Sequence, residues 1–353
     1  MQKITAKIHL GHIQSNAKLF SCLTKNRLCA VVKANAYGHG AEEVVNALEG
    51  IADCFAVALI EEALTIRAAA CGKDILIFTP PLTKEEIFTI AENGFIASVP
   101  DLYTAKLLAQ VCNEKKIRIN VHLKVNTGMN RYGMNGSMLG KVCTFLQKNP
   151  FVQVTGIYSH LYTTNEETSE EQRLLFCRML EICKRYYPKV IAHMGGTYAA
   201  LLGEKFAFDM TRIGIGLYGY LPSTEHKEIA NLELKKAMSI TATTVTNRQL
   251  SYGGVGYGDK RAKEELERIK RVSVCRFGYA DGFLRTQHNG IGNAKERINN
   301  LCMDVCLQKT TAKRGTKILI LSDADEIAKA TGTISYEVLC AATRRAECIY
   351  DYD

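Results

Sequence analysis

Short apolar runs alternate with longer amphipathic segments between residues 28 and 215 of the chain. Runs rich in β-branched residues, bounded by turn residues, are typical of buried strands, and a 3.6-residue apolar period is typical of helices. The pattern predicts eight strands: LCAVVK (28–33), CFAVAL (54–59), DILIFT (74–79), FIASV (95–99), RINVHLKV (118–125), VQVTGIYSH (152–160), KVIAHM (189–194) and FAFDMTRI (206–213).

The segments between these strands carry helix signals. Three predicted helices close on Gly50, Gly72 and Gly94, where a helix C′ residue favours positive φ, and Asp101 is placed to cap a fourth. Continuous apolar strands alternating with helices indicate a parallel sheet that is buried on both faces. We therefore predict a (β/α)8 TIM barrel over residues 11–224, with a doubly wound open sheet as the structural alternative.

The rhythm changes after about residue 225. Thr-, Val- and Ile-rich strands without matching helices occupy residues 225–353, and the boundary falls at LPSTEHKEI. We predict a separate β-rich C-terminal domain. The alternating segment ITAKIHL within residues 1–10 reads as a half-buried strand that could pair with this second domain.

Composition excludes several classes of protein. No window approaches the length of an apolar transmembrane helix, and the first residues carry no signal-peptide pattern, so no membrane association is expected. The 13 cysteines include no CxxC pair and favour a reduced, cytoplasmic protein with no metal site. The net charge of +9 is dispersed among acidic residues and predicts no nucleic-acid partner.

Unusual polar residues follow the predicted strands. In a (β/α)8 barrel the active site lies at the carboxyl ends of the strands. Lys33, Arg131, His160 and Arg212 fall there, as do the small-residue loops GGT (195–197) and RIGIG (212–216). Such loops after the last two strands commonly bind phosphate. A lysine buried near arginines is expected to have a lowered pKa, and the neutral amine can form a Schiff base. A phosphate-bearing aldehyde cofactor bound by a lysine indicates pyridoxal 5′-phosphate.

Seven motifs, in order along the chain, carry a resemblance to a known family. They are AVVKANAYGHGA (30–41), KVNTGMNRYGM (124–134), YSHL (158–161), TRIGIGLYG (211–219), SYGG (251–254), GYADGFLR (278–285) and CMD (302–304). Together they resemble the alanine racemases, fold-type III pyridoxal-phosphate enzymes that join a barrel to a C-terminal β domain. The resemblance implies a cytoplasmic homodimer with shared active sites that interconverts L- and D-alanine and supplies D-alanine for peptidoglycan.

The resemblance also assigns roles to the residues that match. Lys33 would hold the cofactor and act as one base, and Tyr252 of the partner chain would act as the second base on the opposite face of the substrate. Arg212 would bind the pyridine nitrogen, and His160 would orient Arg212. The remaining implied roles are Arg131 at the cofactor phenolate oxygen and the substrate; Lys124 as a possible carbamate; Tyr37, Thr197, Gly214 and Ile215 at the phosphate; and Met303 and Tyr279 at the substrate.

The chain departs from the family pattern at several positions. The family's Asn-Ser pair is Gly196-Thr197, its Asp is Asn126, and Arg344 stands about where the compared enzymes carry a tyrosine. These changes keep open a racemase for serine or another small polar amino acid, or one of broad specificity. A fold-type III decarboxylase is disfavoured by Arg212, and a small non-catalytic pyridoxal-phosphate-binding protein by the second domain.

Overall fold

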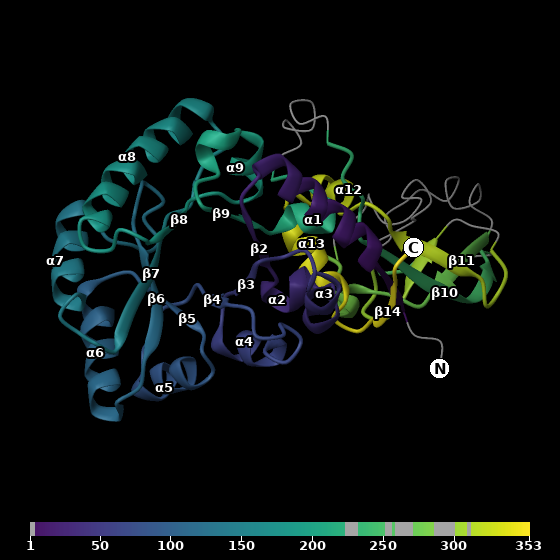
Figure 1. The fold of residues 1–353 in the computed structure, drawn as a ribbon. Coiled ribbons are helices and arrows are strands. Elements are labelled where there is room, and N and C mark those ends of the chain that lie inside the picture. The colour runs from purple at the N-terminus through teal and green to yellow at the C-terminus, as the bar shows by residue number, and fades with distance from the viewer. Residues whose placement is uncertain (1–3, 223–231, 251–255, 258–270, 286–300, 309–311) are drawn as a thin grey trace. The chain divides into compact units, whose positions relative to one another are not determined.

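The computed structural model describes residues 4–222, 232–250, 256–257, 271–285, 301–308 and 312–353. The chain divides into two compact units (Figure 1). The barrel unit comprises Ile13–Ala36 and Ala41–Lys235. The β-rich unit comprises Met1–His12, Tyr37–Gly40 and Lys236–Asp353.

Eight parallel strands form the sheet of the barrel unit, in the order β8-β7-β6-β5-β4-β3-β2-β9. Backbone hydrogen bonds from Asp209 N to Ala192 O (3.0 Å) and from Arg212 N to Gly195 O (3.0 Å) join its two edges, so the sheet closes. The predicted TIM-like barrel is thus confirmed, and all eight predicted strands are present. They are β2 (Arg27–Val31), β3 (Cys54–Val57), β4 (Ile75–Ile77), β5 (Ile96–Val99), β6 (Ile119–Lys124), β7 (Val152–Tyr158), β8 (Ile191–His193) and β9 (Met210–Ile213).

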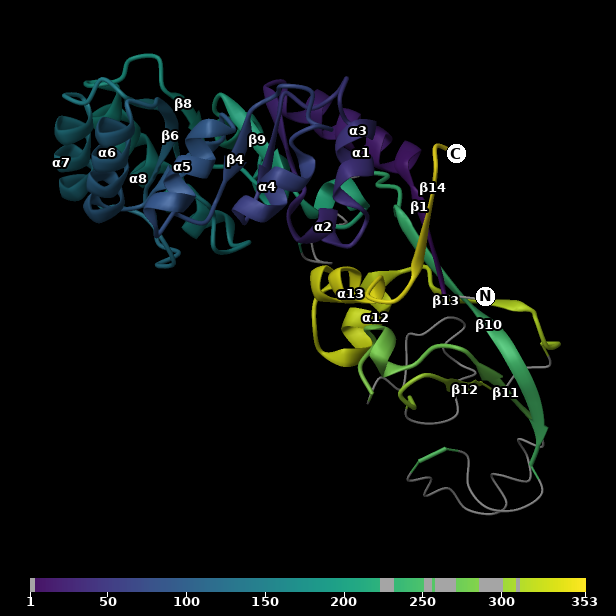
Figure 2. The ribbon, with the colours of Figure 1, turned by 90° about the horizontal axis from the view of Figure 1, so that it is seen from below.

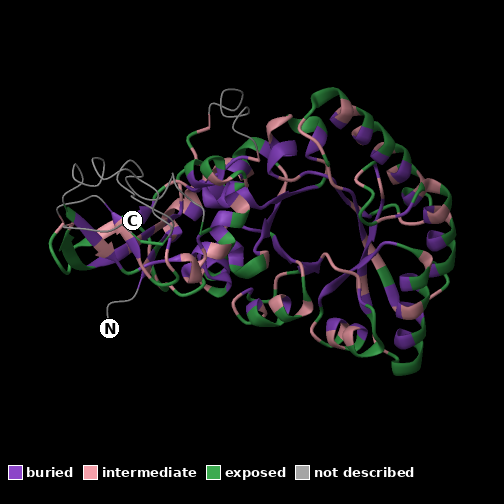
Figure 3. Cartoon of the chain, turned by 180° about the vertical axis from the view of Figure 1, so that it is seen from behind, coloured by how far each residue is buried: buried purple, intermediate pink, exposed green. Residues whose placement is uncertain are grey.

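Amphipathic helices surround this ring, with buried inner faces and exposed outer faces (Figure 3). They are α1 (Leu10–Thr24), α3 (Ala41–Ala47), α4 (Ile60–Ile66), α5 (Lys84–Glu92), α6 (Leu102–Lys115), α7 (Gly136–Leu146), α8 (Glu166–Lys184) and α9 (Thr197–Leu201). Asp101 caps α6 as predicted, by accepting a hydrogen bond from Thr104 N at 2.7 Å. No helix in the ranges given above is long and apolar enough to cross a bilayer.

The predicted positive φ is confirmed at Gly72 (80°) and Gly94 (67°) and is wrong at Gly50. Helix α3 ends at Ala47, three residues before the glycine. The chain then turns through hydrogen bonds from Glu49 N to Asn46 O and from Ile51 N to Leu48 O, so no left-handed residue is needed at Gly50.

The β-rich unit is a sheet in the order β12-β11-β10-β1-β14, with β13 also paired to β10, its longest strand (Figure 2). Its strands are β1 (Thr5–His9), β10 (Met238–Gln249), β11 (Arg271–Cys275), β12 (Cys306–Gln308), β13 (Lys317–Leu321) and β14 (Glu347–Asp351). The N-terminal strand β1 lies between β10 (antiparallel) and β14 (parallel).

Two helices in this unit, α12 (Ala324–Thr331) and α13 (Ser335–Ala342), were absent from the prediction of strands alone. The end signals of α12 are present in the sequence, whereas α13 begins after Ile334 without a side-chain cap. Asp323 caps α12 by accepting from Asp325 N, and Gly332 ends the same helix in the left-handed conformation.

Candidate active site

Lys33 lies just past the carboxyl end of β2 and is half-buried. It opens the short element α2 (Lys33–Tyr37), in which the backbone turns to the left. Ala34, Asn35, Ala36 and Tyr37 all have φ values of 52° or 53°. Four consecutive left-handed residues without a glycine are rare, because each carries a steric cost from its Cβ. Backbone strain of this kind concentrates at functional sites, which marks the segment after Lys33 as one.

Side chains from the barrel hold this turn in place. Glu62 Oε1 accepts from Ala34 N at 2.6 Å, while its Oε2 accepts from Ala58 N at 2.8 Å at the end of β3. Asn35 Oδ1 accepts from Ala41 N (2.8 Å), which ties the turn to the start of α3. Hydrogen bonds on both sides of the turn therefore help to fix the position of Lys33.

Arg212, in β9, is 4% exposed and is surrounded by neutral acceptors. Its Nη1 lies 2.6 Å from His193 Nδ1, and its Nη2 lies 3.3 Å from His160 Nδ1. Nη2 also donates to the carbonyls of Ser159 (2.8 Å) and Met194 (3.2 Å). Burial, then the charge of Arg212, lowers the pKa of His160 to about 3, and the same two causes hold the pKa of His193 well below its usual range. Both imidazoles are neutral, so Arg212 keeps its charge uncancelled.

Tyr158, the last residue of β7, packs its aromatic ring against the side chains of Lys124 and Arg212. The Lys124 Nζ lies 5.1 Å from its ring centroid and the Arg212 guanidinium carbon 5.4 Å, within cation–π range. The ring stacks on His193 at 5.0 Å, and its hydroxyl lies 2.7 Å from Ser98 Oγ. Burial raises the pKa of Tyr158 to about 12, so this side chain stays neutral.

Lys124 ends β6 and is 6% exposed. Its Nζ donates to Val125 O at 2.9 Å. Burial, followed by the charges of Arg212 and Arg131, lowers the pKa of Lys124 to about 7. Near neutral pH a large fraction of this side chain is therefore an uncharged, nucleophilic amine.

Arg131 is exposed, on the loop that follows β6. Backbone hydrogen bonds from Asn126 N to Met134 O (2.9 Å) and from Met134 N to Lys124 O (3.0 Å) close the base of this loop. Asn126, which departs from the family pattern, accepts from the amides of Gly128 (3.0 Å) and Asn130 (3.1 Å). An aspartate can make the same turn, so this departure preserves the loop.

The two glycine-containing loops meet as predicted. Thr197 Oγ1 accepts from Gly216 N at 3.2 Å, which joins the loop after β8 to the 3-10 turn Ile215–Tyr218 after β9. A Cβ on Gly216 would lie 2.5 Å from the Phe20 ring, so only glycine permits this approach. A Cβ on Gly196 would lie 3.3 Å from His160 Cε1, which is a tight contact, so the glycine allows that histidine to approach the loop closely.

The β-rich unit carries the other predicted residues. Tyr279 and Met303 lie on adjoining segments, because Tyr279 N donates to Cys302 O and Ala280 N to Met303 O, both at 3.0 Å. Met303 is 53% exposed. Tyr37 is buried against Tyr336, with ring centroids 5.9 Å apart, and the Arg344 side chain is exposed. Tyr252 lies outside the described residues.

The barrel unit thus brings together Lys33, Lys124, Arg131, His160 and Arg212: each of the other four charges lowers the pKa of His160. Sequence reasoning missed Tyr158 and His193, which end the observed strands β7 and β8 and lie one or two residues before the ends of the predicted ones. Their position at strand ends was the available signal. Within the described ranges, no ion pair involves Lys124, Arg131 or Arg212, so this cationic cluster suits an anionic ligand.

Comparisons with known proteins agree with this geometry. Residues 8–222 match the N-terminal domain model of alanine racemase and residues 237–350 its C-terminal domain model. An alanine racemase of Listeria monocytogenes serotype 4b is 34% identical over 90% of this chain and 89% of its own length. The crystal structure of the alanine racemase from E. faecalis superposes with a TM-score of 0.90 at 26% identity, covering 99% of this chain and 98% of that one. That from Pseudomonas aeruginosa gives 0.86 at 29% identity, covering 99% and 100%. The chain belongs to the alanine racemase family.

Proposed function

We propose that this racemase interconverts L- and D-alanine with pyridoxal 5′-phosphate, in the cytoplasm, and supplies D-alanine for peptidoglycan. The observation that carries the proposal is the buried cationic cluster around Arg212, at the carboxyl ends of strands in a chain of this family. A doubly charged phosphate and a substrate carboxylate are the anions that such a cationic cluster would bind.

The donor set fits this cofactor. Among the described residues, the bonds of Arg212 engage Nη1 and Nη2 but leave Nε–H available for an acceptor such as a pyridine nitrogen. We assign Lys33 Nζ to the covalent link and Arg131 to the phenolate oxygen and the substrate. The phosphate would be held by Tyr37, Thr197, Gly214 and Ile215. When bound, the cofactor supplies an electron sink for the charge that develops at the substrate Cα.

Racemisation requires proton transfer on both faces of Cα. Lys33 would take or return the proton on one face and Tyr252 of the partner chain on the other, in a homodimer that shares its active sites. Met303 and Tyr279 would contact the substrate. A cationic Arg212 favours an unprotonated pyridine nitrogen, which weakens the electron sink and restrains side reactions.

Lys124 would carry a carbamate. Its pKa of about 7 supports this, because CO2 adds only to the neutral amine, and the addition releases one proton. The product carboxylate would lie next to Arg131 and orient it. Addition of 13C-labelled bicarbonate should give a carbamate signal that disappears in Lys124→Met, whereas an unchanged spectrum would contradict the assignment.

The test of the proposed function is a panel of L-amino acids with chiral analysis of the products. Alanine should turn over fastest, Lys33→Ala should abolish both racemisation and the visible absorbance of bound cofactor, and Tyr252→Phe should lose most activity while keeping the absorbance. Faster turnover of serine would transfer the assignment to the alternative, a racemase for serine or another small polar amino acid, which Gly196 and Arg344 keep open. Loss of CO2 from the substrates would instead indicate a decarboxylase.

A further inference from the structure

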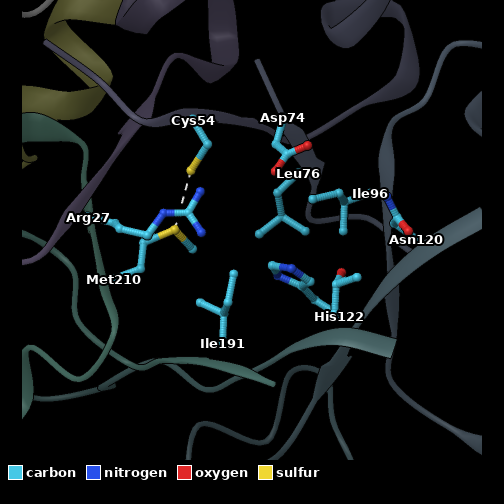
Figure 4. A pocket seen from close by; sticks show the side chains of 10 residues that line it. Arg27, Cys54, Asp74, Leu76, Ile96, Asn120, His122, Ile191 and Met210 are labelled. Atoms are coloured by element: carbon cyan, nitrogen blue, oxygen red, sulfur yellow. Dashed lines mark hydrogen bonds between the residues drawn. The ribbon is translucent and has the colours of Figure 1, made fainter. Parts of the chain in front are cut away.

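A cavity of about 170 Å3 lies inside the barrel, beneath the candidate active site (Figure 4). Side chains two residues apart on a strand point to the same side of the sheet. The same strands can therefore contribute one layer of side chains to the cavity and a second layer to the candidate active site. Each of four strands supplies one residue to the cavity and, two positions later, one to the cluster. The pairs are Ile96 and Ser98, His122 and Lys124, Ile191 and His193, and Met210 and Arg212.

A hydrogen-bonded chain connects these two layers. Arg212 Nη1 lies 2.6 Å from His193 Nδ1, and His193 Nε2 lies 2.9 Å from His122 Nδ1. His122 is 3% exposed and His193 is fully buried. Burial lowers the pKa of His122 to about 3, so both rings are neutral.

Arginine fixes the direction of this chain, because a guanidinium can only donate. His193 Nδ1 must therefore accept, which places the His193 proton on Nε2. That proton can be donated only if His122 Nδ1 accepts, which places the proton of His122 on its own Nε2. One donor thus determines the tautomers of two histidines in sequence.

The His122 ring packs closely against its neighbours. Gly156 lies opposite His122 in the register of β6 and β7, and a Cβ at Gly156 would lie within 2.4–2.6 Å of three ring atoms. His122 lines the cavity together with the polar residues Arg27, Asp74 and Asn120 (Figure 4). A water molecule in this cavity, beside these polar side chains, can accept a hydrogen bond from His122 Nε2.

We propose that His122 is a positioning residue for racemisation: by accepting from His193 it fixes the tautomer of that histidine and hence the orientation of Arg212, while water in the cavity completes the chain. This inference rests on the proposed function for its kinetic consequence. The tautomers themselves do not depend on it.

The first experiment observes the ring nitrogens of the wild-type protein directly. Long-range 1H–15N correlation spectra of histidine-labelled, perdeuterated protein at pH 7.5 should show His193 and His122 neutral, with the proton on Nε2 in both. A charged ring, or a proton on Nδ1 of His193, would overturn the proposal. This measurement of the two tautomers gives a result even if the protein does not racemise alanine.

The second experiment removes or restores the acceptor. In His122→Leu, His193 loses its acceptor in a buried site, and we expect kcat for alanine to fall about tenfold with little change in KM. The absorption spectrum of bound cofactor should shift as Arg212 loses its fixed orientation. His122→Asn, whose amide oxygen can occupy the place of Nδ1, should recover kcat to within about threefold. The control is Met210→Leu. Met210 lines the same cavity but takes no part in the hydrogen bonds of His122 and His193, so this variant should retain wild-type kcat.

Wild-type kcat and spectrum in His122→Leu, or equal damage in His122→Asn, would overturn the proposal. If the leucine variant does not fold, His122→Gln replaces it, because its amide reaches the Nε2 position and leaves Nδ1 unmatched. If the glutamine variant were as active as the asparagine variant, the proposed hydrogen-bonded chain would also be contradicted.

Discussion

Two arginines show how differently the two units use one side chain. Arg212, in the barrel unit, is buried and bonded to imidazoles and backbone carbonyls. Arg345, in the β-rich unit, is exposed and pairs with Asp304 at 2.9 Å and with Asp281 at 3.5 Å. Neutral partners hold Arg212 without cancelling its charge, whereas carboxylates cancel most of the charge of Arg345. A charge that is available to a ligand is therefore recognised by its neutral partners as much as by its burial.

The largest expected effect comes from removing the buried charge. Arg212→Gln should lower kcat/KM for alanine by about 100-fold or more, because a pre-oriented donor at the reacting group is lost. Arg345→Gln is the matched control and should stay within about twofold. Chiral chromatography of the product measures both. Equal losses of kcat/KM in the two variants would contradict the different roles assigned to these arginines.

A second prediction concerns the lowered pKa of Lys124, which burial and the nearby arginines cause. Its pKa is about 7 in the folded protein, against 10.5 ordinarily, so above pH 7 the unfolded chain binds more protons. The free energy of unfolding should therefore rise with pH, by about 2 kcal/mol from this residue between pH 7 and 9, and the contribution is lost as pH falls through 7. Urea unfolding in CO2-free buffer should show this rise in the wild type and a flatter profile in Lys124→Met. Parallel profiles would mean that the cluster does not perturb Lys124.

The smallest effect belongs to the exposed pair. Arg345→Ala should lower the free energy of unfolding only slightly, because the Arg345 and Asp304 side chains are 48% and 59% exposed and water and salt screen their attraction. A double-mutant cycle with Asp304→Ala, repeated at high salt, measures the coupling. A salt-insensitive coupling of several kcal/mol would show that this pair behaves like a buried one.

Much of this could be predicted from the sequence, since β-branched runs such as CFAVAL and TKILILSD mark strands wherever burial is continuous. The strand ends also located Lys33, His160 and Arg212. Helices α12 and α13 were missed because both are short and lie among strands; only α12 has cap residues, Asp323 and Gly332, that mark its ends.

Other features depend on three-dimensional proximity. His193 and His122 are 71 residues apart in sequence, and no local pattern shows that their rings meet at 2.9 Å. The left-handed turn after Lys33 was equally hidden, because alanine and tyrosine carry no preference for positive φ. Glu62 stabilises that turn from helix α4, 28 residues further along the chain.

This turn bears on how the enzyme could evolve. Holding Ala34 and Ala36 in the left-handed region costs roughly 1–2 kcal/mol each, which glycine would largely relieve. Selection for heat resistance should therefore arrive at glycine there, yet the same change would loosen the backbone beside Lys33. A population selected for turnover would keep alanine and accept a less stable protein, so the choice of residue at these positions records which demand was stronger.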